Sequence, residues 1–266
     1  VTFFMLIESF LDYLRLERNY SERTIVSYQT DLREFEGYLK KTESELDWKT
    51  VHADHVRNWM VHLMEDGKAS TSVNRKLSSL RSFYRFLLRK KEVTVNPMLK
   101  VVGPKKKKPL PFFVREKDMN RLLDEIPFGE GFEGCRDRTI LEVFYATGMR
   151  LSELIGLNDV DVDFSAKLIK VTGKRNKQRL IPFGKELEEN LNLYIKVRNE
   201  AFPDGTECFF VLKNGKRMYP MEVYRLVKRN LSKVVSLKKR SPHVLRHTFA
   251  TAMLNDHAEL QSVKEL

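Results

Sequence analysis

The sequence predicts a mainly α-helical protein with a small antiparallel β-hairpin or sheet, divided into two domains. Three observations support this prediction. Apolar residues recur at helical three-and-four spacing through the first hundred residues, a proline- and lysine-rich segment follows, and strand patterns occur only beyond it. The 266 residues suffice for two ordinary domains with real cores. We therefore place a helical domain at residues 1–95, a connector at 96–111 and an α+β domain at 112–266.

Four amphipathic helices account for the first domain, because each of four segments carries a single apolar stripe. The stripes lie within residues 7–14, 25–39, 56–63 and 73–87. Ser21 is a suitable N-cap for the second helix, and Gly67 is a suitable end for the third. Helices with one buried face each predict a small helical bundle.

Residues 96–111 interrupt every helical pattern, since they contain four prolines and the unbroken lysine run 105–108. We interpret the segment as an extended, basic connector and hence as a domain boundary. A nuclear import signal has a similar composition, so the segment alone does not define a function.

The second domain combines helices with strands. Helical patterns cover residues 116–126, 136–147, 149–154, 187–197 and 219–235. Strand patterns cover residues 160–162, 167–171, 178–182 and 209–211. The segment 173–177 predicts a turn between two of these strands, which gives a hairpin with a basic tip. A last helix begins at Pro242, with Ser241 as its N-cap and the proline at the first helical position.

The basic charge indicates a polyanionic partner. The formal net charge is +12, the pI is about 9.6, and residues 68–91 hold eight basic residues and no acidic one. A solvated helix face is the simpler alternative, but unpaired like charges repel one another and call for a counter-anion. We therefore predict contact with double-stranded DNA. The residues assigned to this contact are Ser70, Thr71, Asn74, Arg75, Arg81, Arg85, Lys105, Lys106, Arg175 and Lys177.

Several other classes of protein are disfavoured by the composition. No apolar run approaches the length of a membrane span, and the apolar start of the chain lacks the basic flank of a signal peptide. Cys135 and Cys208 are the only cysteines, and free thiols predict a reducing, cytoplasmic location. No cluster of carboxylates, cysteines or histidines predicts a metal site, and we expect no cofactor.

The last helix offers a place for an anion. His243 and Arg246 are three residues apart and share one face just past its start. A helix N-terminus carries partial positive charge and free N–H groups, which suits a phosphate. Taken alone, the stretch is better explained by a helix with one buried histidine and one surface arginine.

Three blocks of the sequence together resemble the signature blocks of the tyrosine recombinases, the lambda-integrase family. They are residues 147–154 (TGMRLSEL), 171–177 (VTGKRNK) and 242–251 (PHVLRHTFAT). They are most similar to the Xer-like and the phage or transposon integrase branches. The helical first half resembles the core-binding domain of the family, so the resemblance covers nearly the whole chain. One block would be a weak indication, but three in this order are specific.

The resemblance implies a site-specific recombinase that cleaves and rejoins DNA through a 3′-phosphotyrosyl intermediate, without a metal or ATP. It implies a two-domain clamp on DNA, monomeric without DNA and tetrameric on it. Arg150 and Arg246 would grip the scissile phosphate. Lys174 would be the general acid toward the leaving 5′ hydroxyl, and His243 would assist proton transfer at the attacking tyrosine. Glu153 would be a supporting acidic residue.

Elementary chemistry agrees with these roles. Two planar guanidiniums can each donate paired hydrogen bonds to the charge that develops on a phosphodiester, which a lysine cannot. A lysine on an exposed hairpin tip can reach a leaving oxygen. His247 lies one turn from His243, and we interpret it as a residue that packs or supports the site.

Two other functions stay open at this point. The chain could be a DNA-binding regulator that keeps the clamp and lacks the chemistry, or an enzyme resembling type IB topoisomerases. The separate helical domain and the Xer-like blocks favour the recombinase over the topoisomerase.

We expect the 266 residues to bind a DNA site but not to cleave it. In the family the nucleophilic tyrosine follows the third block at a distance that would place it beyond Leu266. The tyrosines Tyr145, Tyr194, Tyr219 and Tyr224 precede that block, and none fits the pattern. Incubation with DNA followed by denaturing electrophoresis should show no protein–DNA adduct, and a phosphotyrosyl-linked product would contradict the prediction.

Overall fold

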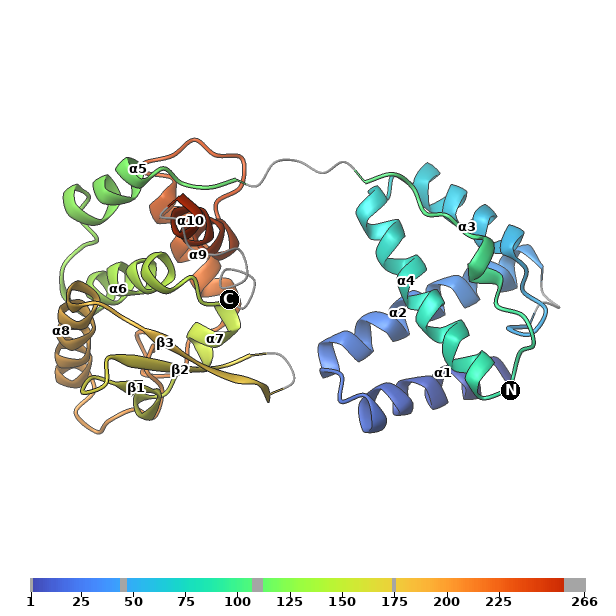
Figure 1. The fold of residues 1–266 in the computed structure, drawn as a ribbon, viewed down its shortest axis with the longest axis horizontal. Coiled ribbons are helices and arrows are strands. Elements are labelled where there is room, and N and C mark those ends of the chain that lie inside the picture. Colours follow the sequence, from blue (N-terminus) through green and yellow to red (C-terminus); the bar gives the residue numbers. More distant parts are fainter. Residues whose placement is uncertain (1, 44–46, 107–111, 174–175, 256–266) are drawn as a thin grey trace. The chain divides into compact units, whose positions relative to one another are not determined.

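The computed structural model describes residues 2–43, 47–106, 112–173 and 176–255 (Figure 1). The chain divides into two compact units, Val1–Pro109 and Leu110–Leu266, and each has its own hydrophobic core. The mainly helical fold with one small antiparallel sheet is confirmed. None of the helices in these ranges has the length and apolarity that a membrane crossing requires.

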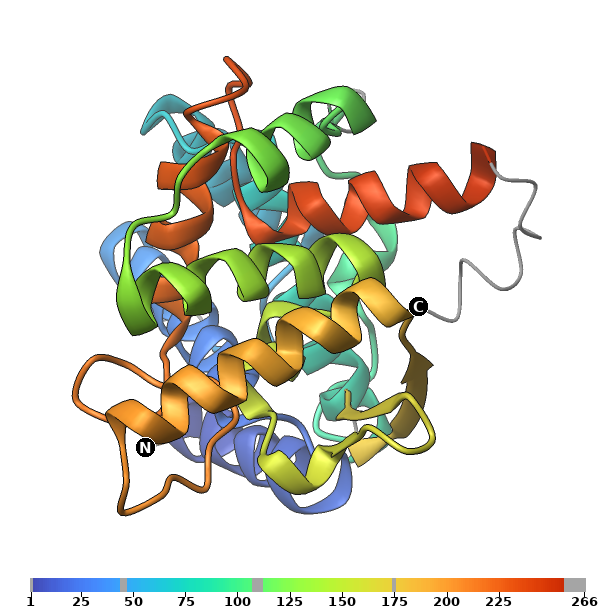
Figure 2. The same cartoon turned by 90° about the vertical axis from the view of Figure 1, so that its left-hand side faces the viewer.

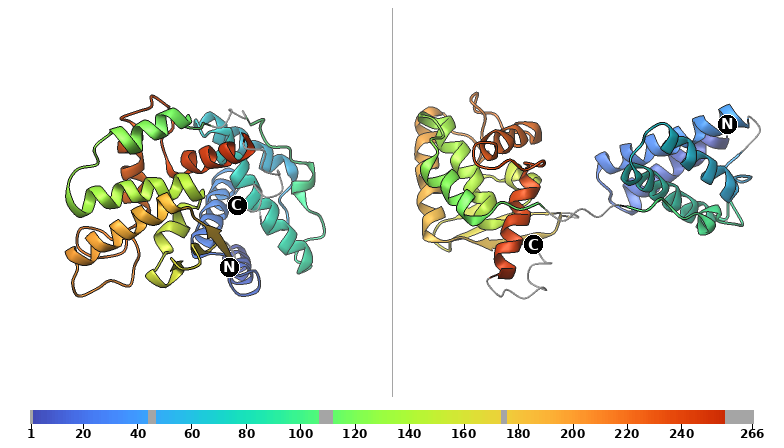
Figure 3. Two further views of the ribbon diagram at one scale, coloured as in Figure 1. Left: turned by 60° about the vertical axis from the view of Figure 1, so that its left-hand side comes forward. Right: turned by 90° about the horizontal axis from the view of Figure 1, so that it is seen from above.

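The first unit contains the helices that the apolar stripes predict, and they pack against one another (Figure 3). They are α1 (Thr2–Asp12), α2 (Glu22–Thr42), α3 (Ala53–Glu65) and α4 (Ser70–Arg89), with the π-helical turn η1 (Tyr13–Glu17) after α1. The hydroxyl of Ser21 accepts a hydrogen bond from the Thr24 N–H at 3.4 Å, which confirms the N-cap of α2. Gly67 follows α3 with a φ of 76°, the left-handed conformation that favours glycine at a helix end.

Aromatic residues form the centre of this core. The ring of Phe35 on α2 lies 4.8 Å from the ring of Trp59 on α3, measured between centroids. Trp48 packs edge-on against Phe83 of α4, also at 4.8 Å. Aromatic side chains bury the largest areas, so these contacts fix how α2, α3 and α4 pack.

The predicted connector is partly folded onto the first unit. Pro97–Lys100 forms a 3₁₀ turn, η2, and the side chain of Asn96 caps it by accepting the Met98 N–H at 3.0 Å. Met98 and Val101 are buried in the core of the first unit. The composition suggested an extended chain from residue 96, but these two apolar side chains favour burial over extension.

Side chains of α3 and α4 hold the backbone that follows η2. Arg57 donates to the carbonyl of Lys100 at 2.9 Å, and Arg81 donates to that of Val101 at 3.1 Å. Asn74 donates to the carbonyl of Pro104 at 2.8 Å. The expected extended connector therefore does not begin before residue 105.

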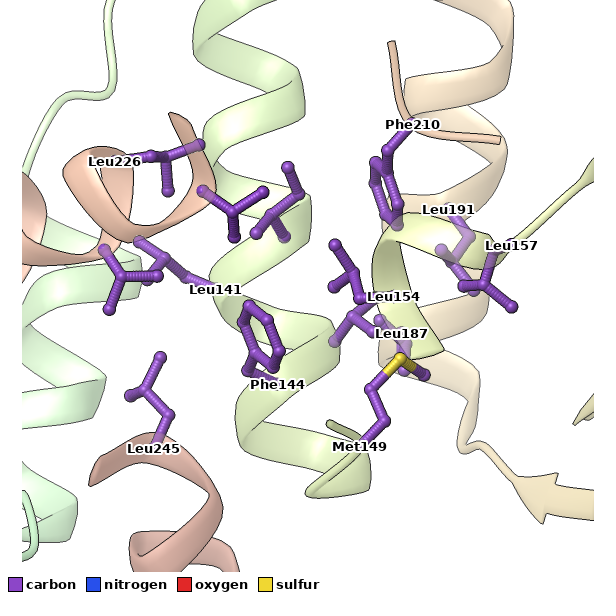
Figure 4. Packing of buried hydrophobic residues seen from close by; sticks show 14 of the residues in the cluster. Leu141, Phe144, Met149, Leu154, Leu157, Leu187, Leu191, Phe210, Leu226 and Leu245 are labelled. Carbon is purple, nitrogen blue, oxygen red and sulfur yellow. The ribbon is translucent and has the colours of Figure 1, made fainter. Parts of the chain in front are cut away.

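The second unit is built around α6 (Gly131–Thr147). Around it lie α5 (Glu116–Asn120) with its π-helical continuation η3 (Arg121–Glu125), α7 (Leu151–Gly156), α8 (Lys185–Ala201), α9 (Pro220–Leu231) and α10 (Pro242–Asn255). Helix α6 packs against α8 on one side and against α10 on another (Figure 2). Its residues Leu141 and Phe144 lie among apolar side chains of the neighbouring elements (Figure 4). A helix buried on several faces can act as the scaffold of the unit.

The sheet of the second unit contains β1 (Val162–Asp163), β2 (Leu168–Thr172) and β3 (Gln178–Pro182) in that order, all antiparallel. Ile169 pairs with Ile181, and Val171 pairs with Arg179. The three apolar members of these pairs are buried, so they mark the inner face of the hairpin.

Two strand predictions differ from the structure. Residues 159–161 form the 3₁₀ turn η4, and β1 begins only at Val162. Residues 209–211 form no strand, since this region has only the isolated bridges Asn158–Cys208 and Val211–Arg217. The buried Arg198 explains both departures. It donates to the two carboxylate oxygens of Asp159 at 2.6 and 2.7 Å and to the carbonyl of Phe209 at 3.0 Å, which holds both segments as loops.

Glu142 on α6 is a buried acid whose ionisation is unfavourable. One of its oxygens accepts a hydrogen bond from the Asn190 amide at 2.6 Å, and the other has no hydrogen-bond partner in the described part of the chain. Burial raises the pKa of Glu142 to about 7. A carboxyl whose pKa rises on folding binds its proton more tightly in the folded state. Stability therefore falls as the pH rises from about 4.5 to about 7.

Glu142→Gln should remove the loss of stability that comes from ionising this buried carboxyl group at high pH. We expect it to raise the free energy of unfolding by about 1–3 kcal/mol at pH 8 and to change it little at pH 5, since the acid is then neutral. Thermal unfolding at the two pH values tests this. Glu189→Gln, at an exposed position on α8, is the matched control and should behave alike at both. An equal gain at pH 5 and pH 8 would contradict the explanation.

Candidate active site

Two of the three signature blocks meet at Gly148. This residue ends α6 in the left-handed conformation, with a φ of 57°. Its carbonyl accepts a hydrogen bond from the guanidinium of Arg246, which lies 98 residues further along the chain. A Cβ at Gly148 would lie 2.2 Å from the ring of Phe249, so α10 packs directly on the glycine. The absence of a side chain thus allows α10 to carry Arg246 to the end of α6.

Arg150 and Glu153 are joined at the start of α7. Arg150 is the N-cap, and its N–H donates to one oxygen of Glu153 at 2.7 Å. Its guanidinium Nη1 donates to the other oxygen at 2.8 Å. The side chain of Glu153 is fully buried, whereas that of Arg150 is 38% exposed. The carboxylate caps the helix and holds the arginine at the surface of the site.

The hairpin adds a second arginine to the same carboxylate. Arg179 on β3 donates from Nη1 and Nη2 to the two oxygens of Glu153 at 2.7 and 2.9 Å. We did not assign Arg179 to the site from the sequence. The feature of the sequence that could have revealed it is the alternation of side chains along β3. Arg179 falls on the same face as the buried Ile181 and therefore points inward.

The electrostatics of this cluster favour an anion. Burial raises the pKa of Glu153, but the hydrogen bonds from Arg179 and Arg150 outweigh it, and the pKa lies below its ordinary value. The hydrogen bond to Gly148 places Arg246 near Arg150, which lies two residues after Gly148 in the chain. Burial, followed by the charge of Arg150, lowers the pKa of Arg246. In the described ranges, the guanidiniums of Arg150 and Arg179 contact this one carboxylate, and that of Arg246 lies near enough to interact with its charge. This surplus of positive charge attracts a phosphate.

The turn that carries the predicted general acid adjoins the cluster. Lys174 and Arg175 lie outside the described residues. Gly173 directly precedes them, and a Cβ there would lie 3.3 Å from Glu153 Oε1 and 3.9 Å from Arg150 Nη1. The Gly173 N–H donates to the carbonyl of Lys177 at 2.7 Å, which closes the turn. The base of the turn therefore lies against the Arg150–Glu153 pair.

Helix α10 carries the remaining predicted residues. His243 lies in its first turn and is exposed, three residues before the half-buried Arg246. His247 is also exposed, so the interpretation of it as a packing residue is wrong, and a role in supporting the site stays a prediction. Thr248 ties the helix to the start of the unit, because its hydroxyl accepts the Val114 N–H at 2.9 Å.

Part of the basic face of α4 is paired with acids of α2. Arg75 donates to both oxygens of the buried Asp31 at 2.5 and 2.8 Å, and Lys76 contacts Asp31 and Glu34. The premise that the face lacks acidic partners is therefore wrong for Arg75 and Lys76. The pattern along one helix could not reveal acids supplied by another. Asn74 and Arg81 hold the backbone after η2, as described above.

The exposed side of α4 still presents polar groups at helical spacing. Thr71, Arg75, Ser78 and Arg85 are all exposed, and Ser70 is partly exposed. A groove between α2 and α4 is lined by Arg23, Thr24, Ser27, Tyr28, Arg75, Ser78 and Ser79. Lys105, Lys106 and Lys177 are also exposed. Hydroxyls and guanidiniums in one groove are groups that bind backbone phosphates.

No group of histidine, cysteine, aspartate or glutamate side chains within the structurally described ranges is arranged to hold a metal ion.

Comparison with known proteins identifies two family matches. Residues 113–266 match the phage integrase family, and residues 7–91 match the phage integrase N-terminal SAM-like domain. The chain is 38% identical to the tyrosine recombinase XerC of Chlorobaculum tepidum, over 97% of this chain and 84% of that protein. It is 39% identical to XerC of Pelotomaculum thermopropionicum, over 98% of this chain and 88% of that protein.

Solved structures show the same fold. The Tn1549 transposon integrase in complex with circular intermediate DNA matches with a TM-score of 0.74 and 21% identity, covering 97% of this chain and 90% of that one. The XerH recombinase bound to a palindromic difH substrate matches with a TM-score of 0.76 and 19% identity, covering 93% and 73%.

Gly148→Ala should destabilise the second unit. An alanine would adopt an unfavourable left-handed conformation and would press its Cβ into Phe249. We expect a loss of about 1–3 kcal/mol, measured by urea unfolding. Gly156→Ala is the matched control, because a Cβ there meets nothing within 4 Å and its φ is not positive. Equal stabilities of the two variants would contradict this account of Gly148.

Proposed function

The chain belongs to the phage integrase family of tyrosine recombinases, and from this premise we propose that it binds a specific DNA site and supplies the phosphate-binding residues for strand exchange through a 3′-phosphotyrosyl intermediate. The observation that supports this function best is the convergence of Arg150 and Arg246 beside Glu153, with more positive than negative charge. Such a site matches a single phosphodiester.

The two arginines would bind the scissile phosphate. Attack by a tyrosine oxygen on phosphorus forms the 3′-phosphotyrosyl bond and breaks the bond to the 5′ oxygen. Negative charge then grows on the non-bridging oxygens of the phosphate. Arg150 and Arg246 would neutralise it with hydrogen bonds that strengthen in the transition state. Because guanidiniums supply the positive charge, the proposed mechanism requires no metal.

The protons would be handled by two other residues. Lys174 would give a proton to the leaving 5′ oxygen, and the position of Gly173 against Arg150 and Glu153 supports its delivery to the same phosphate. His243, one turn before Arg246, would assist removal of the proton from the attacking tyrosine. The covalent link conserves the energy of the phosphodiester, so the 5′ hydroxyl of a partner strand can reverse the reaction without ATP.

The first unit would hold the DNA through the groove between α2 and α4. The exposed residues of α4 and the exposed lysines 105 and 106 would contact backbone phosphates. We propose that both units bind one duplex as a clamp, and that four protomers assemble on two duplexes although the free protein is a monomer. A cytoplasmic location is part of the same proposal.

The phosphate contact can be tested in a binding assay. A duplex that the chain selects from a random library is resynthesised with one neutral methylphosphonate at each position in turn. One phosphate in each half-site should cost the wild type roughly tenfold or more in affinity. The same methylphosphonate should reduce the affinity of Arg246→Gln much less, because this variant already lacks the arginine that contacts that phosphate. Equal costs in both proteins at every position would contradict the proposed grip.

Arg85→Gln should weaken DNA binding without unfolding the first unit. Arg85 is exposed on α4, the helix that forms one side of the groove. Burial raises the pKa of Tyr28 in this groove, and the positive charge of Arg85 opposes that rise. We expect a several-fold loss of affinity and a decrease of about one in the salt slope. Lys40→Gln on the far end of α2 removes the same charge and should leave the slope unchanged. Equal slopes for both variants would exclude a phosphate contact by Arg85.

A further inference from the structure

We propose that Arg179 is a positioning residue of the recombination site: it holds the Glu153 carboxylate and thereby leaves the Arg150 guanidinium oriented for the scissile phosphate. This inference rests on the function proposed above and extends it to a residue outside the three signature blocks. It also explains why a half-buried arginine occupies an inward-facing strand position that otherwise suits an apolar side chain.

The carboxylate of Glu153 is saturated by its neighbours. Its two oxygens accept four hydrogen bonds, two from Arg150 and two from Arg179, at 2.7 to 2.9 Å. A carboxylate has about four acceptor positions, so no further donor is needed to satisfy it. Without Arg179, the fully buried Glu153 carboxylate would lose half of its hydrogen bonds, which would destabilise the folded state.

Arg179 and Arg150 bind Glu153 with different numbers of guanidinium nitrogens, and this difference decides what is left to bind the phosphate. Arg179 uses both terminal nitrogens in a two-pronged contact with Glu153. In the described structure Arg150 uses only Nη1 of its guanidinium in a hydrogen bond to Glu153. The rest of its planar fork is left for an anion. If Arg179 were absent, Glu153 would draw Arg150 into a two-pronged contact of its own and compete with the phosphate.

The location of Arg179 favours an indirect role. Its side chain is 22% exposed, whereas Lys177, two residues earlier, is exposed. Arg179 stands opposite Val171 in the strand that returns from the turn. Its contact with Glu153 therefore attaches β3 to α7, next to the segment that carries Lys174. Both terminal nitrogens of Arg179 already donate to Glu153, which favours support of the carboxylate over contact with DNA.

A matched control exists in the same unit. Arg198 is buried, and like Arg179 it contacts one carboxylate, that of Asp159, with both terminal nitrogens. It holds two loops, and no contact with Arg150, Glu153 or Arg246 is recorded for it within the described residues. Arg198→Gln therefore removes a similar ion pair without removing the proposed positioning.

The experiment measures how inorganic phosphate binds to the 266-residue chain with isotope-labelled arginines. Guanidinium NMR signals of Arg150 and Arg246 should shift and saturate in the wild type. Arg179→Gln should weaken phosphate binding on the order of tenfold, the effect typical of removing a residue that orients a ligand-binding group. Arg179→Lys, which keeps the charge but cannot bridge both oxygens, should be intermediate. Arg198→Gln should bind phosphate as the wild type does.

The outcomes separate this inference from the proposed function. If phosphate leaves the Arg150 and Arg246 signals of the wild type unchanged, the proposed phosphate site is overturned. If the wild type responds and Arg179→Gln binds equally well, only the positioning role is overturned. If Arg198→Gln weakens binding as much as Arg179→Gln, the effect is general destabilisation, and the inference fails. If Arg179→Gln does not fold, Arg179→Lys decides, and wild-type affinity in that variant overturns the inference.

Discussion

A buried carboxylate between two arginines is the interaction on which the candidate site depends. A charge in the protein interior is tolerated only when it is paired and hydrogen-bonded. Glu153 meets this condition with Arg150 from its own helix and Arg179 from the sheet. The need to satisfy one carboxylate thus fixes α7 against the hairpin, and the third arginine, Arg246, makes the local charge positive.

The scaffold around this carboxylate is made by α6 and its end at Gly148. Helix α6 packs against α8 and α10, so the element that ends beside Arg150 is anchored on several sides. Gly148 lets Phe249 approach the backbone and accepts the hydrogen bond of Arg246. The arginines therefore meet because of rigid helix packing and a glycine contact, and not because they are near in sequence.

The sequence predicted the helices of the first unit well, since a single apolar stripe and a cap such as Ser21 depend only on local spacing. It also brought Arg150, Glu153 and Arg246 into one site, through the resemblance of three blocks. It failed where the outcome depended on contacts between elements. Arg179 reaches from β3 to Glu153 on α7, and Asp31 reaches Arg75 from another helix. Val160 has a strand-forming side chain, but the segment turns because Arg198 holds Asp159.

The attachment of residues 100–104 to α3 and α4 shortens the stretch of chain that can act as a tether between the two units. A chain that is held at Lys100, Val101 and Pro104 by Arg57, Arg81 and Asn74 has fewer residues left to span between the units than its composition suggests. As long as a tether can still span two binding sites, shortening it raises the effective concentration of the second unit at a ligand that the first unit has already bound. In the proposed clamp, the second unit would therefore search a smaller volume once the first unit has bound a duplex.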